Sequence, residues 1–187
     1  MRDALILELG VRELSTFCRF AEFAYGKIEK SGGQDAGEVF FYAHAMLGNC
    51  AMAARLLRSH ALAEHSAGRT IAELLEVPRK YQIEDEAIRD MLEGYDSRLA
   101  KGLTLYGEGT EILDFNIGDR DSFEDDMSLF LRHYDPTVDV LTLLENELNL
   151  TLIANEIADI RSRAEAWLES NASLAEQPAA VSIPPSQ

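Results

Sequence analysis

The sequence predicts an all-α protein, a bundle of four to five helices with a small β-hairpin before the C-terminal helix. Two observations support this prediction. Apolar residues recur at three-and-four spacing over several long segments, which is the periodicity of helices with one buried face. The chain also has only 5 proline residues, and three of them (Pro178, Pro184 and Pro185) fall in its last ten positions. Its body therefore contains few residues that break helices.

The first long helix is expected over residues 11–29, with an extension over residues 3–10. The Gly32-Gly33 pair ends it, because glycine readily adopts the left-handed conformation found after helices. The second helix is expected over residues 38–62. It is apolar nearly all round, with no Asp, Glu, Lys or Arg in the stretch Val39–Ala54. We therefore expect the other helices to surround it.

The later helices are shorter or begin with clear signals. A short helix over residues 70–76 stops before Pro78. The next helix, over residues 85–101, begins with acidic side chains that complement the positive end of the helix dipole. The last helix is expected over residues 150–168, with one apolar face.

The segment between these last two helices has a different pattern. Residues 112–117 are expected to be short and extended or rich in turns, and residues 119–126 form an acidic loop. Two strands are expected at residues 128–134 and 138–143, because apolar and β-branched residues flank the tight turn Asp135-Pro136-Thr137. This pair is the predicted hairpin.

Length and composition indicate one domain. With 187 residues and 47% hydrophobic residues, the chain has enough material for one buried core, which we place in residues 1–170. Residues 171–187 are rich in Ala, Ser, Pro and Gln and are expected to form a flexible tail.

Charge and cysteine content restrict the partners and the compartment. The net charge is −16, which repels phosphate groups and disfavours RNA as a partner. The two cysteines, Cys18 and Cys50, lie in apolar helical patterns and do not form a CxxC motif. We expect a cytoplasmic protein, because no secretory leader is visible and the stretch Val39–Ala54 is too short to span a membrane.

The segment from Ile88 to Arg98 has the most informative pattern. Its apolar residues form one stripe of a helix, whereas Gly94 lies on the opposite side among charged residues. Glycine inside a helix costs about 1 kcal/mol relative to alanine, so close approach by another backbone would explain its presence. A solvated charged face with a tolerated glycine is the alternative.

This segment resembles the motif-bearing helix of the HEPN superfamily, all-α proteins that include RNA-cleaving toxins. The family motif is an arginine, a polar residue and a histidine four to six positions after the arginine. Arg89 and Asp90 match its start, and a family pattern of the form apolar-Arg-Asn-x-x-Glu-His-Phe-Asp-x-Arg aligns without gaps onto residues 88–98. At the position of the histidine, however, this chain has Gly94.

The resemblance implies a HEPN-like arrangement of helices and, because of Gly94, a protein that is not a nuclease. Moving the proton of an RNA 2′-hydroxyl near pH 7 requires a group such as imidazole. Arg89, Asp90 and Gly94 are then remnants of a ribonuclease motif. We expect function through protein association or through weak binding of RNA or a nucleotide.

Two alternatives stay open. One is a metal-independent endoribonuclease in which another histidine, His133 above all, or else His44 or His65, replaces the missing one. The other is a helical scaffold whose resemblance to the family is accidental. We expect no metal site and no cofactor, since His60 and His65 are poorly spaced for zinc ligands on one helical face.

The resemblance also implies a homodimer in which the helix at residues 85–101 lies at the two-fold axis. Gly94 would allow two helices to approach, and Arg89 of one subunit would reach Glu93 or Asp96 of the other. Arg98 would help to neutralise the duplicated acidic residues.

Overall fold

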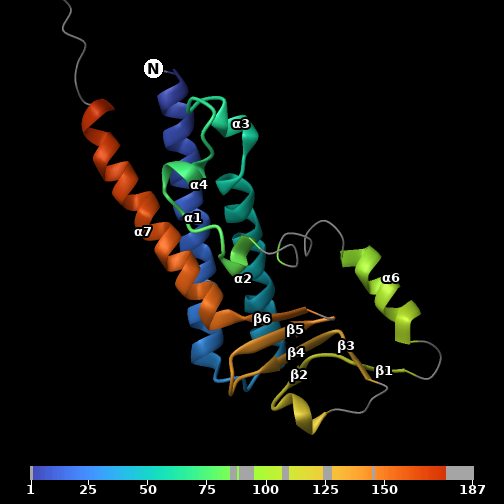
Figure 1. Cartoon of the computed structure of the whole chain (residues 1–187). Coiled ribbons are helices and arrows are strands. Elements are labelled where there is room, and N and C mark those ends of the chain that lie inside the picture. Colours follow the sequence, from blue (N-terminus) through green and yellow to red (C-terminus); the bar gives the residue numbers. More distant parts are fainter. Residues whose placement is uncertain are drawn as a thin grey trace, which may run out of the picture.

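The computed structural model of the chain describes residues 2–84, 88, 95–106, 110–123, 128–144 and 146–175. Three long helices lie side by side, and a four-stranded sheet lies at one end of them (Figure 1). The helices are α1 (Arg2–Ser31), α2 (Ala36–Leu57) and α7 (Leu150–Ala175). α1 lies between the other two and contacts both.

Local signals set the ends of the first two helices. α1 begins at Arg2, so the predicted N-terminal extension is confirmed. Gly32 and Gly33 follow it with φ angles of 57° and 72°. Both angles lie in the left-handed region, which glycine enters at little cost. The carboxylate of Asp35 then accepts a hydrogen bond from the backbone N–H of Glu38 at 3.0 Å and caps α2.

The second helix differs from its prediction in two ways. It ends at Leu57, and α3 (His60–Ala63) follows separately because the Ser59 hydroxyl caps it by accepting a bond from the N–H of Leu62. The other helices also do not surround α2, since Phe41 is 67% exposed and Met52 37% exposed. An apolar stretch therefore indicated a buried helix, but one side of that helix faces outward.

The segment after α3 is held against α7. It contains α4 (Ile71–Leu74), whose capping box joins Thr70 and Glu73, and the 3₁₀ helix η1 (Gln82–Glu84). Glu156 of α7 is 6% exposed, and its carboxylate accepts hydrogen bonds from the backbone N–H groups of residues 82 and 83 at 2.8 and 2.9 Å. A buried carboxylate thus satisfies two N–H groups at the start of η1.

A second contact to α7 stabilises an unusual backbone conformation. Glu76 has a φ of 53°, which a residue with a side chain rarely adopts. The Arg163 guanidinium donates to the carbonyl oxygens of Leu75 and Glu76 at 3.3 and 3.0 Å and also binds Asp159. Asp159 in turn accepts a bond from the Tyr81 hydroxyl at 2.6 Å.

The remaining elements lie between η1 and α7. α6 (Tyr95–Tyr106) stands apart from the three long helices in Figure 1. The strands after it are β1 (Glu111–Leu113), β2 (Asn116–Ile117), β3 (Ser128–Phe130), β4 (Arg132–Asp135), β5 (Val140–Leu143) and β6 (Asn146–Asn149), with the 3₁₀ helix η2 (Arg120–Ser122) between β2 and β3.

The strands form two sheets with orders β1-β3 and β2-β4-β5-β6. β1 pairs in parallel with β3, and β2 in parallel with β4, whereas the pairs β4-β5 and β5-β6 are antiparallel. Both parallel pairs keep the same register, with Leu113 opposite Phe130 and Asn116 opposite His133. The two parallel pairs are therefore one ladder that bends at residues 114–115 and 131.

The four-stranded sheet has two different faces. Tyr134, Leu141 and Leu148 lie side by side on neighbouring strands and belong to the same core cluster as the buried faces of the helices. On the opposite face, His133 is 1% and Thr142 2% exposed. This alternation places one row of the sheet in the helical core and the polar row on the far side.

Asp139 joins three elements of the fold. It lies in the β4-β5 turn with a φ of 54°. Its carboxylate accepts hydrogen bonds from the hydroxyls of Tyr25, Tyr134 and Thr151 at 2.8, 2.7 and 2.5 Å. The N–H of Leu150 donates to the Asp139 carbonyl at 2.9 Å. One turn residue therefore connects α1, the sheet and the start of α7.

The prediction of an all-α bundle with one small hairpin is wrong, and the fold is mixed α/β. The predicted hairpin exists as β4 and β5, and the last helix begins at Leu150 as predicted. β6 and the parallel strand pairs were not predicted from the sequence. These strands have two to four residues, too few for a periodic pattern, and parallel pairing joins segments that are distant in the sequence.

α7 continues to Ala175, so it includes five residues that were expected in the tail. Residues 176–187 lie outside the described structure.

Candidate functional site

A hollow of about 560 Å³ opens where the outward side of α2 meets the bend of the strands. Its volume lies in the range typical of ligand pockets. Phe40, which is 1% exposed, belongs to the core beneath it, whereas Phe41 is 67% and Phe115 46% exposed. The other residues that line the hollow are Gly37, His44, Ala45 and Arg132.

Phe115 has an unusual conformation for an aromatic residue. It lies at the bend between β1 and β2 with a φ of 56°, a left-handed conformation that costs roughly 1–2 kcal/mol for a residue with a side chain. The Phe115 ring meets the Phe40 ring edge-on, with the two centroids 5.4 Å apart. The bend thus fixes an aromatic ring beside the hollow instead of letting it alternate along a regular strand.

A salt bridge holds this conformation. Arg132 donates from Nε and from a terminal nitrogen to the two carboxylate oxygens of Asp114 at 2.7 and 2.6 Å. The Asp114 carboxylate also accepts the N–H of Phe115 at 2.9 Å, and the Arg132 guanidinium lies 4.4 Å from the centroid of the Phe115 ring. The bonds from Arg132 keep the pKa of Asp114 below its usual value. The salt bridge between Arg132 and Asp114 therefore holds the guanidinium against the Phe115 ring and fixes the position of that ring.

His44 supplies a polar group at the same hollow. Its Nδ1 lies 2.7 Å from the carbonyl oxygen of Phe40, one turn earlier in α2. A carbonyl oxygen only accepts, so Nδ1 donates, and in the neutral ring Nε2 is then the nitrogen that accepts. The hollow is therefore lined by aromatic rings and by the imidazole of His44.

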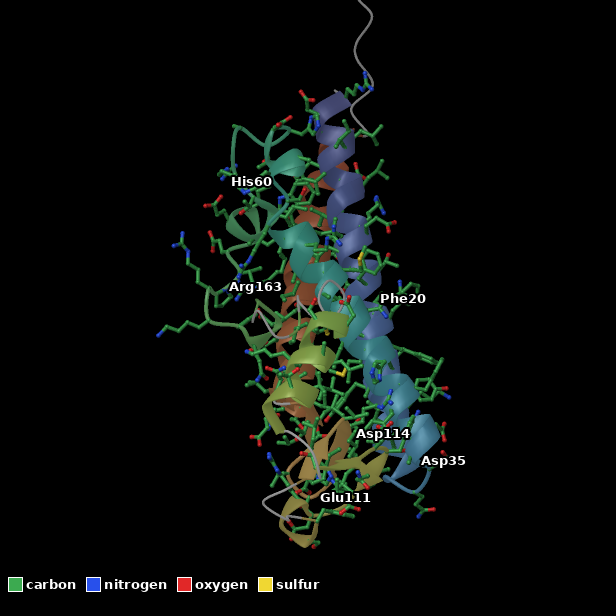
Figure 2. All side chains as sticks on the ribbon, turned by 90° about the vertical axis from the view of Figure 1, so that its right-hand side faces the viewer. Phe20, Asp35, His60, Glu111, Asp114 and Arg163 are labelled. Atoms are coloured by element: carbon green, nitrogen blue, oxygen red, sulfur yellow. The ribbon has the colours of Figure 1, made fainter. Side chains whose placement is uncertain are left out.

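Acidic side chains lie close in the sequence to residues that line the hollow. Asp35 and Glu38 are exposed on either side of Gly37 in the sequence, and Glu111 is exposed on β1. Figure 2 shows Asp35, Glu111 and Asp114 at the same end of the molecule. Arg132 already neutralises Asp114, so the carboxylates of Asp35 and Glu38, on either side of Gly37 in the sequence, are the acidic groups that would favour a basic partner here.

His133 lies elsewhere, in the polar row on the far side of the sheet. It is 1% exposed, between the rings of Phe123 and Phe130, at centroid distances of 5.6 and 4.9 Å. Within the described part of the chain, neither of its ring nitrogens has a hydrogen-bond partner. Burial lowers the pKa of His133 below its usual value. A general base has to reach the proton that it removes, and His133 is closed to a large substrate in this conformation.

The predicted motif falls almost entirely outside the described residues. Arg89, Asp90, Glu93 and Gly94 all lie there. Of residues 85–94 the structure describes Ile88, which is fully buried in the core, as expected for the apolar stripe. Two further members of the motif lie in α6. Asp96 is exposed there, and for Arg98 the description is limited to the backbone.

The other predicted histidines occupy different places. His44 lines the hollow, whereas His65 pairs with Asp3 at 2.8 Å near the start of α1. His60 begins α3. In the described part of the chain, no group of three or more His, Cys, Asp or Glu side chains is arranged to hold a metal ion.

Of the residues that line the hollow, only His44 was a candidate functional residue in the sequence. Phe41 was expected in the core because its helix is apolar nearly all round, Phe115 in a short extended or turn-rich piece, and Arg132 in the first strand of the hairpin. The one signal available was the pair Asp114-Phe115 inside an apolar strand, which marks a bend. That Arg132 lies opposite this bend follows from the parallel register, which is set by tertiary structure.

Comparisons with protein-family models, with curated proteins and with solved structures found no match to this chain. Among the described residues, no helix combines the length and the apolar character that crossing a membrane requires.

Proposed function

We propose that this chain is a binding protein without catalytic activity, and that the hollow beside α2 receives an apolar side chain from a basic segment of another protein. The central observation is that Phe41 and Phe115 are left 67% and 46% exposed around a hollow of about 560 Å³. Aromatic side chains around a pocket are the usual anchors of protein association.

The chemistry of the hollow supports a polypeptide partner. Its rings would pack against an aromatic or aliphatic side chain, while the nearby carboxylates of Asp35 and Glu38 would favour Lys or Arg beside that anchor. The net charge of −16 favours the same kind of partner and repels RNA phosphates. Asp114 and Arg132 neutralise each other, so they serve to hold Phe115 and not to transfer protons.

Selection from a displayed library of random peptides tests this proposal without a known partner. Peptides that bind the native chain are expected to combine one aromatic or large aliphatic residue with Lys or Arg. Phe41→Ala should weaken their binding at least tenfold, which corresponds to about 1.4 kcal/mol.

Phe20→Ala is the matched control, because Phe20 is also an exposed helical phenylalanine, 56% exposed on α1. It should leave peptide binding unchanged. Selected peptides that bind the Phe41→Ala and native chains equally, or a selection that yields no basic consensus, would contradict the proposal.

The ribonuclease alternative is tested separately. Purified protein incubated with mixed-sequence RNA and EDTA should leave the RNA intact. Cleavage that Arg89→Ala abolishes would establish the alternative and overturn a non-catalytic role. A scaffold without a binding role predicts neither cleavage nor peptide selection.

The homodimer implied by the resemblance also stays a proposal, because Arg89, Glu93 and Gly94 lie outside the described residues. Gly94→Trp would separate the subunits if the helix at residues 85–101 forms their interface.

A reducing cytoplasm is likewise proposed as the compartment of this protein. The buried thiol of Cys18, whose pKa burial raises to about 12, supports a packing role for that residue.

A further inference from the structure

Large apolar side chains stand exposed along the outward side of α1. The exposed fractions of Leu5, Leu9, Phe20 and Phe23 are 56, 52, 56 and 64%. Figure 2 shows that Phe20 points away from the side of the molecule on which His60 and Arg163 lie. Exposed apolar side chains gathered on one helix face indicate an interaction surface more strongly than scattered ones do.

These four residues, together with Arg12 and Thr16, form one stripe, because their spacing of three or four residues keeps them on the same side of a helix. We call this set the α1 stripe. Its two polar members are turned to their own helix. Arg12 binds Glu8 at 2.7 Å, and the Thr16 hydroxyl donates to the Arg12 carbonyl at 2.9 Å. The stripe is therefore apolar at Leu5 and Leu9 and at Phe20 and Phe23, and the Lys27 amino group lies 5.4 Å from the centroid of the Phe23 ring.

The apolar residues of the α1 stripe are spaced almost symmetrically about residue 14, so two antiparallel copies of α1 would bring them opposite one another. Leu5 and Phe23 lie nine residues on either side of residue 14, and Leu9 and Phe20 lie at nearly equal distances from it. In two antiparallel copies of α1 that cross near residue 14, Leu5 would face Phe23 of the other copy, and Leu9 would face its Phe20. An isologous interface repeats every such contact twice.

The charges of α1 also fit a second copy. α1 contains five basic and five acidic side chains, so it carries no net charge in a chain of net charge −16. In the antiparallel arrangement, Glu8 of one copy lies near Arg19 of the other on the same edge of the stripe, and the symmetry repeats this pair. On the other edge, Glu13 of one copy would lie near Glu13 of the other, and repulsion between these like charges opposes association.

We propose that a second copy of this chain covers the α1 stripe, with the two α1 helices antiparallel about a two-fold axis near residue 14. In this arrangement residues 2–26 of the two helices overlap over about 36 Å, and a contact about 12 Å wide would bury roughly 430 Å² on each subunit. This area is at the low end for specific dimers, so we expect a dissociation constant in the micromolar range. The inference does not depend on the peptide-binding function proposed for the hollow.

Sedimentation velocity of the full chain, at concentrations of roughly 1–300 µM, tests the proposal. The native chain should move from 20.8 kDa towards twice this mass as its concentration rises. Phe20→Asp should weaken the dimer at least tenfold, whereas Phe41→Asp, which changes a still more exposed ring outside the α1 stripe, should not. A native chain that stays monomeric over the whole range, or a Phe20→Asp variant that dimerises normally, would overturn the proposal.

A charge exchange and a cross-link test the antiparallel arrangement. Arg19→Glu should weaken the dimer, and adding Glu8→Arg should restore it. Under mild oxidation, a mixture of Leu5→Cys and Phe23→Cys chains should form mixed disulfides, whereas Leu5→Cys alone should form none. Cross-linking of Leu5→Cys to itself would indicate parallel helices and refute the arrangement. A dimer that Gly94→Trp abolishes but Phe20→Asp does not would assign the interface to the helix at residues 85–101 instead.

Discussion

Replacing Asp139 should destabilise the whole fold, because this turn residue joins α1, the sheet and α7. In Asp139→Ala the hydroxyls of Tyr25, Tyr134 and Thr151 lose their common acceptor. Thr151 is exposed and can bind water instead, whereas Tyr134 is 5% exposed and cannot easily do so. The two remaining hydrogen bonds, from Tyr25 and Tyr134 to the charged carboxylate, contribute about 1.5 kcal/mol each, so their loss should lower the free energy of unfolding by about 3 kcal/mol.

The backbone adds a smaller contribution. Asp139 has a φ of 54°, which Asp tolerates better than Ala does. We therefore expect Asp139→Ala to lower the free energy of unfolding by about 4 kcal/mol. Asp139→Gly removes the same hydrogen bonds but accepts the left-handed backbone, and should lose about 3 kcal/mol. Asp139→Asn keeps one carbonyl acceptor and the backbone tolerance, and should lose about 1–2 kcal/mol.

Urea denaturation followed by far-ultraviolet circular dichroism measures these differences, provided that the slope of the transition is the same in all variants. The order expected is native, Asn, Gly and Ala, from most to least stable. A loss below about 1 kcal/mol for both Ala and Gly would refute the hydrogen-bond argument. A large loss for Ala together with no loss for Gly would show that the backbone conformation, and not the carboxylate, is what matters at this position.

Three further predictions concern buried or paired groups. His133→Leu should raise the free energy of unfolding at pH 7 by about 1 kcal/mol, because it removes two buried nitrogens without partners. Since burial lowers the pKa of His133, the native chain should lose stability as the pH falls below about 6.5, and the variant should lose less; equal acid sensitivity in thermal melts would contradict this. Tyr25 and Tyr81 should ionise at about 12 in the folded protein, because burial, and then the carboxylates that they bind, raise their pKa. Their contribution to stability is complete below pH 10 and is lost as the pH rises towards 12, so ultraviolet absorption that shows both ionised at pH 10 would disprove it. Glu156→Gln should speed amide hydrogen exchange at residues 82 and 83 at least tenfold, because an amide group can accept from one of these N–H groups but would oppose the other; unchanged protection would show that the carboxylate does not hold this segment.

The sequence by itself determined the parts of this protein that depend on local order. The periodicity over residues 3–29 and the Gly32-Gly33 pair specify α1, and the apolar face over residues 150–168 specifies the start of α7. The turn Asp135-Pro136-Thr137 specifies the hairpin of β4 and β5. In each case neighbouring residues supply both the hydrogen bonds and the apolar pattern, so a short window contains the whole signal.

The tertiary structure alone decided the mixed α/β fold and the hollow. β1 and β2 have three and two residues and pair with strands 17 positions later in the chain. No local pattern records such a pairing, because its hydrogen bonds form between distant segments. This register brings Arg132 opposite Phe115 and leaves the outward side of α2 uncovered. Phe41 has the same apolar character whether a neighbour covers it or not, so only the arrangement of the other elements makes it a surface residue.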